Sequence, residues 1–166
     1  MNAEYLVNQL QLLPHPEGGF YKETYRSNEG MDAHCLPQRF GGERSFSTAI
    51  YFLLRKGEFS AFHRIKSDEG WHFYAGGGLR IHVIDAEGNY SFIRLGAKLD
   101  EGEVFQAVVP AGCWFASEPE VGTEFSLVGC TVSPGFDFAD FEMAGVAQLS
   151  KEFPQHSSLI SRLCRL

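Results

Sequence analysis

The stretch from Ser60 to Gly78, which reads SAFHRIKSDEGWHFYAGGG, constrains the fold more than any other part of the chain. It gathers two histidines, two carboxylates and four aromatic residues into two short runs joined by a polar turn. Short runs that are rich in aromatic and apolar residues and bounded by turn residues are typical of strands. We therefore predict a β-hairpin here, and we expect it to carry most of the chemistry of the chain.

Alternate residues of a strand share a face, so each strand of this hairpin presents two different surfaces. In the first strand, His63 shares a face with apolar neighbours. In the second strand the apolar count favours an inward face with Trp71 and Phe73, which takes Glu69 with it and leaves His72 outward. An inward Glu69 opposite His63 would raise the pKa of the imidazole, because a nearby negative charge favours its cationic form.

The remaining residues predict a protein of about eight to ten short strands, because alternation recurs between turn residues along the chain. Further strands are expected over residues 20–27, 45–55, 79–85, 90–95, 104–109, 113–117 and 123–132. Short helices are expected over residues 2–13 and 157–166, and the irregular stretch 28–44 could cover a pocket entrance. At 166 residues, we expect a single domain over residues 1–166. The pattern favours an all-β sandwich or small barrel.

The overall charge and the cysteines limit the classes of partner and the compartment. The net charge of −7 and the scattered basic residues argue against a nucleic-acid partner, since phosphate binding needs clustered Lys and Arg. No apolar run approaches the length of a membrane span, and the amino terminus does not read as a signal peptide. The four cysteines lie far apart, so we expect reduced, mostly buried thiols in a cytoplasmic protein.

Two segments of the chain resemble the conserved motifs of the cupin superfamily. Residues 57–76 are similar to the first cupin motif, G-x5-H-x-H-x3-4-E-x6-G, and residues 109–112 to the Pro-x-Gly start of the second. Residues 15–21, 67–74 and 127–142 further resemble the cupin-5 family, formerly a domain of unknown function. The resemblance implies a double-stranded β-helix, a jelly-roll barrel like that of the RmlC sugar epimerases, which is usually paired as a homodimer. It implies no settled reaction.

The departures from the cupin motif bear on whether the chain binds a metal. Ala61 stands where the motif has its first histidine, and Phe115 stands at the histidine of the second motif. A catalytic metal normally takes three protein ligands and a water molecule. Only His63 and Glu69 remain at ligand positions, unless His72 turns inward. No cofactor is therefore firmly implied, and a divalent transition metal held by these three residues is the alternative.

Three functions remain open for the barrel interior. The first is an isomerase or epimerase acting on a small polar ligand such as a sugar or nucleotide sugar, since related epimerases resemble this chain in keeping one motif-one histidine. His63 would be the catalytic base and Glu69 its catalytic partner. A metal-dependent oxygenase or lyase is the second possibility, and a non-catalytic small-molecule binder is the third. The candidate binding residues are His72, Trp71, Tyr74, Glu17 and Trp114.

Each of these residues also has a purely structural interpretation. Glu69 could cap the hairpin turn, and Glu17 could belong only to the turn formed by the following glycine pair. Trp114 could fill the barrel, and His72 could pack with its aromatic neighbours. We expect Asp137 and Asp140 to cap backbone amides in a loop.

Overall fold

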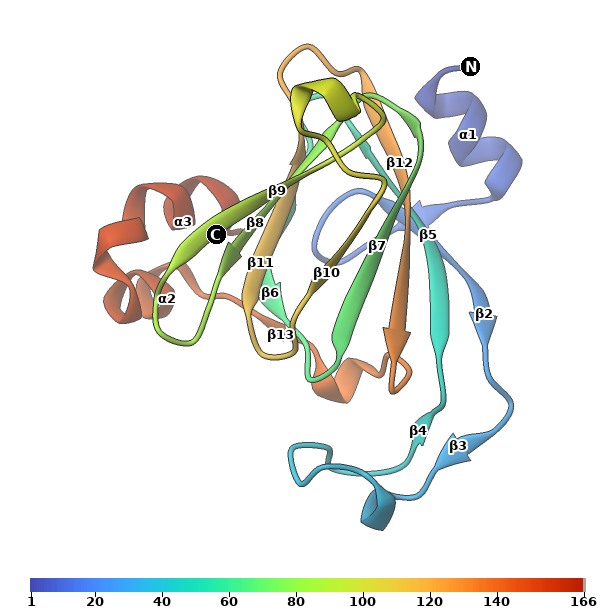
Figure 1. The fold of residues 1–166 in the computed structure, drawn as a ribbon, viewed down its shortest axis with the longest axis vertical. Helices are drawn as coiled ribbons and strands as arrows, with labels where there is room; N and C mark the ends of the chain where they lie inside the picture. Colours follow the sequence, from blue (N-terminus) through green and yellow to red (C-terminus); the bar gives the residue numbers. More distant parts are fainter. Residues whose placement is uncertain (166) are drawn as a thin grey trace.

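The computed structural model describes residues 1–165, and its centre is a barrel of two antiparallel sheets (Figure 1). In spatial order, the first sheet contains β1 (Leu13–Pro14), β2 (Phe20–Arg26), β5 (Thr48–Arg55), β12 (Phe125–Ser133), β7 (Asp68–Gly76) and β10 (Gln106–Val109). The second sheet contains β13 (Glu142–Met143), β6 (Ser60–Arg64), β11 (Trp114–Pro119), β8 (Leu79–Ile84) and β9 (Tyr90–Leu95). A small separate pair contains β3 (Gly30–Met31) and β4 (Arg44–Ser45). The predicted all-β jelly roll is confirmed.

Helical turns lie outside the barrel. The α-helices are α1 (Ala3–Leu10), α2 (Val146–Glu152) and α3 (Ser157–Leu163), and the 3-10 turns are η1 (Ala33–Cys35), η2 (Leu99–Glu101), η3 (Phe138–Asp140) and η4 (Pro154–His156). Asn2 caps α1 through Tyr5 N–H, as expected. The helix is shorter than predicted because Gln11 adopts a left-handed conformation (φ 55°) and the chain then enters β1. The end of the carboxyl-terminal helix expected at residue 166 lies outside the described residues.

The main core fills the space between the two sheets. Trp71 on β7 is fully buried, and its ring meets Phe52 of β5 and Phe115 of β11 edge-on, at centroid distances of 6.1 and 6.3 Å. Phe73 packs against the same core, and Glu69 is buried on the same side of β7. The predicted inward face of this strand is therefore correct, and it positions a carboxyl group inside the barrel.

Two smaller apolar clusters attach the helices to the outer faces of the sheets. Apolar side chains of α1 pack on the first sheet against Leu53 and Leu127. On the second sheet, Phe62 and Trp114 pack beneath α2 and α3, against Leu149 and Ile160. The predicted amino-terminal helix therefore covers one sheet face.

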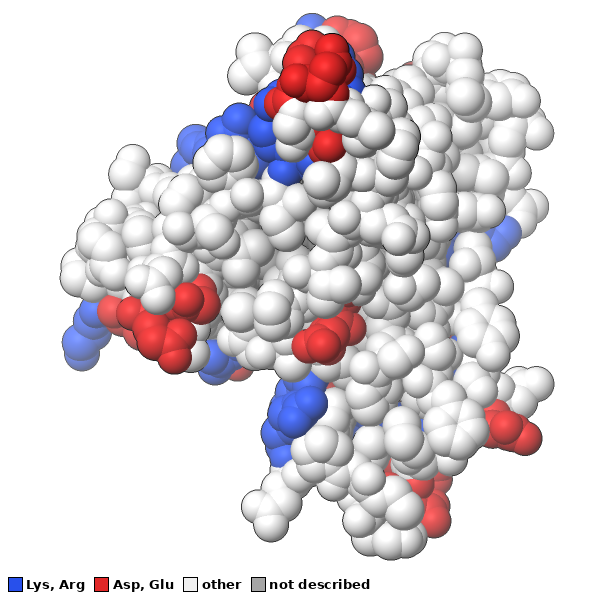
Figure 2. Space-filling view, in the orientation of Figure 1, with Lys and Arg blue, Asp and Glu red and all other residues white. Residues whose placement is uncertain are grey.

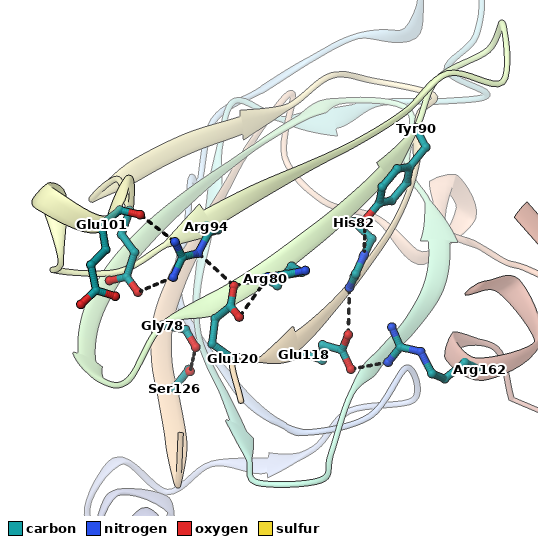
Figure 3. A network of polar contacts seen from close by, with 11 residues as sticks. Gly78, Arg80, His82, Tyr90, Arg94, Glu101, Glu118, Glu120, Ser126 and Arg162 are labelled. Atoms are coloured by element: carbon teal, nitrogen blue, oxygen red, sulfur yellow. Dashed lines mark hydrogen bonds and ion pairs between the residues drawn. The ribbon is translucent and has the colours of Figure 1, made fainter. Parts of the chain in front are cut away.

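A network of charged and polar side chains crosses the second sheet (Figure 3). His82 of β8 contacts Tyr90 Oη at 2.9 Å and Glu118 Oε1 at 3.0 Å, and Arg162 of α3 donates to the other oxygen of Glu118 at 2.6 Å. Alongside, Arg80 and Arg94 share the carboxylate of Glu120, and Gly78 accepts from Ser126. These contacts fix α3 and the strand ends to the barrel.

Part of the outer face of the first sheet has no covering element among residues 1–165. Tyr74 and Val108 each expose about half of their surface there. Figure 2 shows that most of the surface over β7, β10 and β12 lacks charged side chains. The charges of this acidic chain therefore gather elsewhere.

Candidate functional site

A cavity of about 500 Å³ opens into the barrel beside β2 and the segment 136–141. Its walls combine strand residues with aromatic side chains of that segment. The lining residues are His15, Glu17, Tyr21, Glu23, Arg26, Thr48, Ile50, His63, Ile65, Glu69, Cys130, Val132, Phe136, Asp137, Phe138 and Phe141. An apolar cavity of this size with a few convergent polar groups is the usual form of a small-molecule site.

A tight turn at residues 15–19 brings Glu17 into this cavity. His15 N–H donates to the carbonyl of Gly19 at 2.9 Å, and Gly18 N–H donates to the carbonyl of His15 at 3.0 Å. Gly18 adopts φ 115°, and a Cβ there would overlap the carbonyl of Phe59, so this position requires glycine. Ala61 N–H of β6 then donates to the carbonyl of Glu17 at 2.8 Å, which fixes the turn against the strand that carries His63.

Glu17 and His63 form a buried ion pair. His63 Nε2 lies 3.0 Å from Glu17 Oε2, and their side chains are only 4% and 8% exposed. His63 Nδ1 lies 2.7 Å from the carbonyl of Ala61, which can only accept a hydrogen bond. Both ring nitrogens therefore face acceptors, the arrangement that an imidazolium requires. The ring also packs on Phe115 and Phe141, at centroid distances of 4.1 and 5.2 Å.

The pKa values of this pair move in opposite directions. Burial lowers the pKa of His63, but the charge and hydrogen bond of Glu17, with smaller contributions from Glu69 and the Ala61 carbonyl, raise it above its usual value. Burial raises the pKa of Glu17, but the charge and hydrogen bond of His63 together with His15 hold it below its usual value. Both shifts therefore favour the ionised form of the pair.

Glu69 differs from Glu17 although both carboxyl groups line the same cavity. Burial raises the pKa of Glu69 to about 7, the charge of Glu17 adds to this rise, and His63 and the adjacent Cys130 thiol oppose it. A carboxyl group with this pKa exchanges protons readily near neutral pH. The cavity wall thus places the fixed Glu17–His63 ion pair in the same site as Glu69, a carboxyl group that is able to accept or release a proton.

The structure brings together three of the predicted site residues: His63, Glu69 and Glu17. The prediction that Glu69 is the direct partner of His63 is wrong, because the ion-pair partner is Glu17. The turn interpretation of Glu17 is correct for its backbone but misses its side chain, which the glycine turn directs into the barrel.

The other predicted binding residues lie outside the cavity wall. His72 is on the outer face of β7, where Nε2 contacts Thr131 Oγ1 at 2.9 Å and Nδ1 contacts the Gln106 amide at 3.0 Å. Tyr74 is on the same outer face and is 51% exposed. The strand alternation that takes Glu69 inward turns both of these side chains outward.

The two tryptophans fill apolar clusters. Trp71 lies between the sheets, behind the cavity wall. Trp114 lies beneath the carboxyl-terminal helices, where the guanidinium of Arg64 stacks on its ring at 4.4 Å. Trp114 therefore fills space beneath the helices, and the expectation that it fills the barrel is wrong, because strand alternation turns the neighbouring Phe115 into the barrel instead.

The residues present do not fit the alternative metal site. His72 faces the opposite side of β7 from Glu69, so the set His63, Glu69 and His72 is not assembled. The Nε2 atom of His63 lies at hydrogen-bond distance from Glu17. Across residues 1–165, no group of three or more His, Cys, Asp or Glu side chains is arranged to hold a metal ion.

Sequence reasoning missed several residues of the cavity, including His15, Tyr21 and Arg26. His15 and Tyr21 lie in the segment HPEGGFY, whose resemblance to the cupin-5 family could have marked them as candidate site residues. In the segment 136–141, Asp137 caps Ala139 N–H at 2.8 Å, as expected. Asp140 instead forms a buried bidentate pair with Arg44, at 2.6 and 2.7 Å, and this pair fixes the aromatic segment to the end of the loop 28–44.

Two further expectations concern the cysteines and membranes. All four cysteines are free thiols, with Cys130 and Cys164 buried and Cys35 exposed. Within residues 1–165, none of the helices combines the length and apolar character needed to cross a bilayer. The cytoplasmic location stays a prediction.

Comparisons with known proteins place the chain among relatives without a stated reaction. It is 33% identical over 148 residues to "Uncharacterized protein YML079W" of Saccharomyces cerevisiae, covering 84% of this chain and 73% of the relative. Protein SO0799 from Shewanella oneidensis is 43% identical with a TM-score of 0.89, covering 99% of this chain and 98% of that one. A hypothetical protein from Leishmania major is 38% identical with a TM-score of 0.90, and the match covers all of both chains.

A more distant structure shares the fold alone. Oxalate decarboxylase from Bacillus subtilis is 16% identical with a TM-score of 0.55, and the match covers 90% of this chain but 36% of that enzyme. The family model described as "Cupin superfamily (DUF985)" matches residues 4–144. Because this match covers most of the chain, and the fold and near relatives agree with it, the chain belongs to the DUF985 family of the cupin superfamily.

Proposed function

We propose that the chain binds a small polar ligand in the barrel cavity and transfers a proton on it, as an isomerase or epimerase of a sugar-like compound does. The observation that carries this proposal is the Glu69 carboxyl group, whose pKa of about 7 lies in the working range of a general base, beside the fixed ion pair of Glu17 and His63. General acid–base catalysis is most efficient when the pKa of the catalytic group lies near the operating pH.

The proposed reaction consists of proton transfers alone and needs no external oxidant or reductant. The Glu69 carboxylate removes a proton from a carbon atom next to a carbonyl group of the ligand. The electron pair of the broken C–H bond forms a carbon–carbon double bond, and the carbonyl electrons move to its oxygen, which gives an enolate. A proton delivered by water to the same carbon from the opposite face yields the epimer. A proton returned by Glu69 to the neighbouring carbon yields the isomer, because the hydroxyl proton on the first carbon moves at the same time to the enolate oxygen and leaves a carbonyl group there.

His63 takes a different role in this proposal from the catalytic base expected from the sequence. Both of its ring nitrogens are within hydrogen-bond distance of protein acceptors, so neither is free to receive a proton from a ligand. Its positive charge, held in a buried site, would instead favour the negative charge that develops on the enolate. We therefore assign His63 to stabilising charge and Glu17 to holding His63 in place.

Hydrogen exchange with D2O tests the proposal directly. The protein is incubated in D2O with dihydroxyacetone, L-erythrulose, D-xylulose and a hexose series, and deuterium at the carbon next to the carbonyl is followed by NMR. The wild type should label at least one compound, and Glu69→Gln should lose labelling by about a hundredfold or more, as expected for a general base. His72→Gln, altered on the outer sheet face, serves as the matched control and should label normally.

Two results would refute the proposal. One is the absence of labelling for every compound, and the other is labelling by Glu69→Gln at the wild-type rate. A non-catalytic binder is the second candidate, favoured by the aromatic wall of Phe136, Phe138 and Phe141 over the cavity. It predicts that a compound raises the melting temperature of the protein without becoming labelled.

We also propose that two copies of the chain pair through the uncovered outer face of the first sheet. The chain carries a net charge of −7, so like-charged copies approach most easily through a surface without charges. The area over β7, β10 and β12 meets this condition (Figure 2), and the outer face of these strands exposes Tyr74 and Val108. Half-exposed apolar side chains grouped on one sheet face are typical of interaction sites.

A further inference from the structure

His15 is held rigidly in the cavity wall by aromatic rings. Its ring meets Tyr21, Phe52 and Phe141 nearly edge-on, at centroid distances of 4.5, 6.0 and 6.4 Å. Its side chain is 8% exposed and lines the same cavity as Glu69. A side chain gripped on several sides loses little further freedom when a ligand binds, so it is suited to positioning one.

The hydrogen bonds of His15 determine which ring nitrogen carries the proton. The backbone N–H of Glu17 donates to His15 Nδ1 at 3.3 Å, whereas the nearest carboxylate oxygen of Glu17 is 3.7 Å away, beyond hydrogen-bond distance, so this nitrogen presents its lone pair to the backbone. Burial lowers the pKa of His15, and the positive charge of His63 lowers it further, while the charge of Glu17 opposes both without reversing the shift. The ring is therefore neutral at neutral pH, and its single proton lies on Nε2.

The Nε2–H group of His15 has no hydrogen-bond partner among residues 1–165. By contrast, His63 in the same wall has acceptors at both nitrogens. A donor that faces a cavity and has no protein partner is satisfied by a ligand or by water. The hydrogen-bonding role of His15 toward a ligand is therefore fixed, because a neutral imidazole with its proton on Nε2 can only donate from that nitrogen.

We infer that His15 is a neutral hydrogen-bond donor that holds the carbonyl oxygen of the ligand, which makes the ligand class open-chain hydroxyketones and hydroxyaldehydes. This inference rests on the proposed proton transfer. A neutral imidazole beside a carboxylate base is an established combination for forming an enolate, because the donor stabilises the developing oxyanion from a fixed position. His15 would touch the oxygen, and Glu69 would act on the neighbouring carbon.

The charges around the cavity favour such a neutral ligand over an anionic one. Glu17, Glu23, Glu69 and Asp137 all line it. The guanidinium of Arg26 at the same cavity is already bonded to Glu23 and to the carbonyl of Phe136, at 2.7 and 3.1 Å. A carboxylate or phosphate group would therefore meet carboxylates with no free arginine to compensate for them. A carbonyl group needs only a donor, which His15 supplies.

The first test reads the tautomer of His15 without any ligand. Long-range ¹H–¹⁵N NMR of uniformly labelled protein distinguishes a ring protonated at Nε2 from one protonated at Nδ1 and from the imidazolium, and His15→Asn identifies the resonance. At neutral pH the His15 ring should be neutral and protonated at Nε2. A ring protonated at Nδ1, or an imidazolium, would overturn the inference while leaving the role of Glu69 intact.

The second test compares ligands that differ only in the carbonyl group. Dihydroxyacetone is paired with glycerol, and L-erythrulose with erythritol, and their dissociation constants are measured by ligand-observed NMR. The wild type should bind each ketone about threefold to tenfold more tightly than its alcohol, the range expected for one added hydrogen bond. Equal affinity within each pair would contradict a carbonyl-specific donor.

Two variants separate the donor from its structural surroundings. In His15→Asn the amide oxygen replaces Nδ1 as the acceptor of the Glu17 N–H, but the donor into the cavity is lost. In His15→Gln an amide N–H replaces the donor at Nε2. His15→Asn should lose the preference for ketones and slow deuterium labelling by about a hundredfold. His15→Gln should recover part of both.

The outcomes also distinguish this inference from the proposed function. If the wild type and His15→Asn label ketones equally while Glu69→Gln does not, His15 is only structural and the proton transfer stands. If no compound is labelled, the proton transfer fails, and the inference fails with it. If His15→Asn and His15→Gln are equally impaired, the neutral donor is not the group that matters, and the inference is wrong.

Discussion

Replacing Glu69 by glutamine should stabilise the protein, and the gain should depend on pH in a defined way. The pKa of this carboxyl group is 4.5 for a solvent-exposed glutamate, as in the unfolded chain, and about 7 in the folded protein, with burial as the main cause of the rise. The folded state therefore keeps a proton that the unfolded chain releases. A folded carboxyl group held in its unfavourable charged form lowers the free energy of unfolding at high pH.

The sign and magnitude follow from the two pKa values. Below pH 4.5 the group is protonated in both states and costs nothing. Between 4.5 and about 7 only the unfolded chain releases its proton, so stability falls as the pH rises through this range. At about 1.36 kcal/mol for each pKa unit, the full cost above the folded pKa is about 3 kcal/mol. Glutamine is neutral at every pH, so Glu69→Gln escapes this cost.

Urea unfolding across a pH series measures this effect. The free energy of unfolding of Glu69→Gln minus that of the wild type should rise by about 3 kcal/mol between about pH 4.5 and about pH 8. Glu17 and His63 are present in both proteins, so their own titration largely cancels. Glu124→Gln is the control for the loss of one negative charge, because Glu124 is an exposed partner of Lys56.

A difference between Glu69→Gln and the wild type that stays constant with pH would refute the reasoning. It would mean that Glu69 titrates alike in the folded and unfolded states, and that the cavity does not perturb it. The proposed base would then have no special fitness for proton transfer near neutral pH. A rise of the same size in Glu124→Gln would show instead that the total charge of the chain is responsible.

Three further predictions concern the ion pairs and the outer face. Glu17→Gln should destabilise the protein by about 2–4 kcal/mol in urea unfolding, as the loss of a buried partner does. The loss should be largest at about pH 5–6, because the lowered pKa of Glu17 stabilises the folded state above pH 4.5 and the raised pKa of His63 stabilises it below pH 6.5. A loss that did not change with pH would contradict this. Arg44→Met should cost about 3 kcal/mol in calorimetry, and adding Asp140→Leu should restore most of it; no recovery would argue that the pair has another role. Tyr74→Glu should convert a dimer to a monomer in light scattering, and an unchanged mass would exclude this face as the interface.

Much of the fold could be predicted because its determinants are local. The alternation of residues 69–73 identifies the buried face of β7, and the glycine at position 76 keeps the spacing of the cupin motif. The strand Tyr90–Leu95 is found where it was expected, after a turn of three polar or small residues. The carboxyl-terminal region was harder, since α2 has no side-chain cap to mark its start.

The candidate site was only partly predictable because its main contact is not local. Glu17 and His63 are far apart in the sequence, and they meet only because Gly18 permits a turn that docks on β6. Strand alternation placed His63 and Glu69 correctly, but it contains no information about a third group arriving from a loop. The tautomer of His15 likewise depends on one backbone N–H, which no sequence pattern reveals.

The turn that carries Glu17 is also held by Arg165, which follows α3. Arg165 donates to the carbonyls of Glu17 and Phe59, each at 3.3 Å, so residues 148 positions apart in the sequence share one hydrogen-bond cluster. Joining such distant residues requires closing a long loop, whose entropy is recovered only by later contacts. We therefore expect the cavity wall that carries Glu17 to reach its final position late in folding. A chain still emerging from the ribosome would already contain the barrel strands, but it would not yet hold Glu17 in its final position.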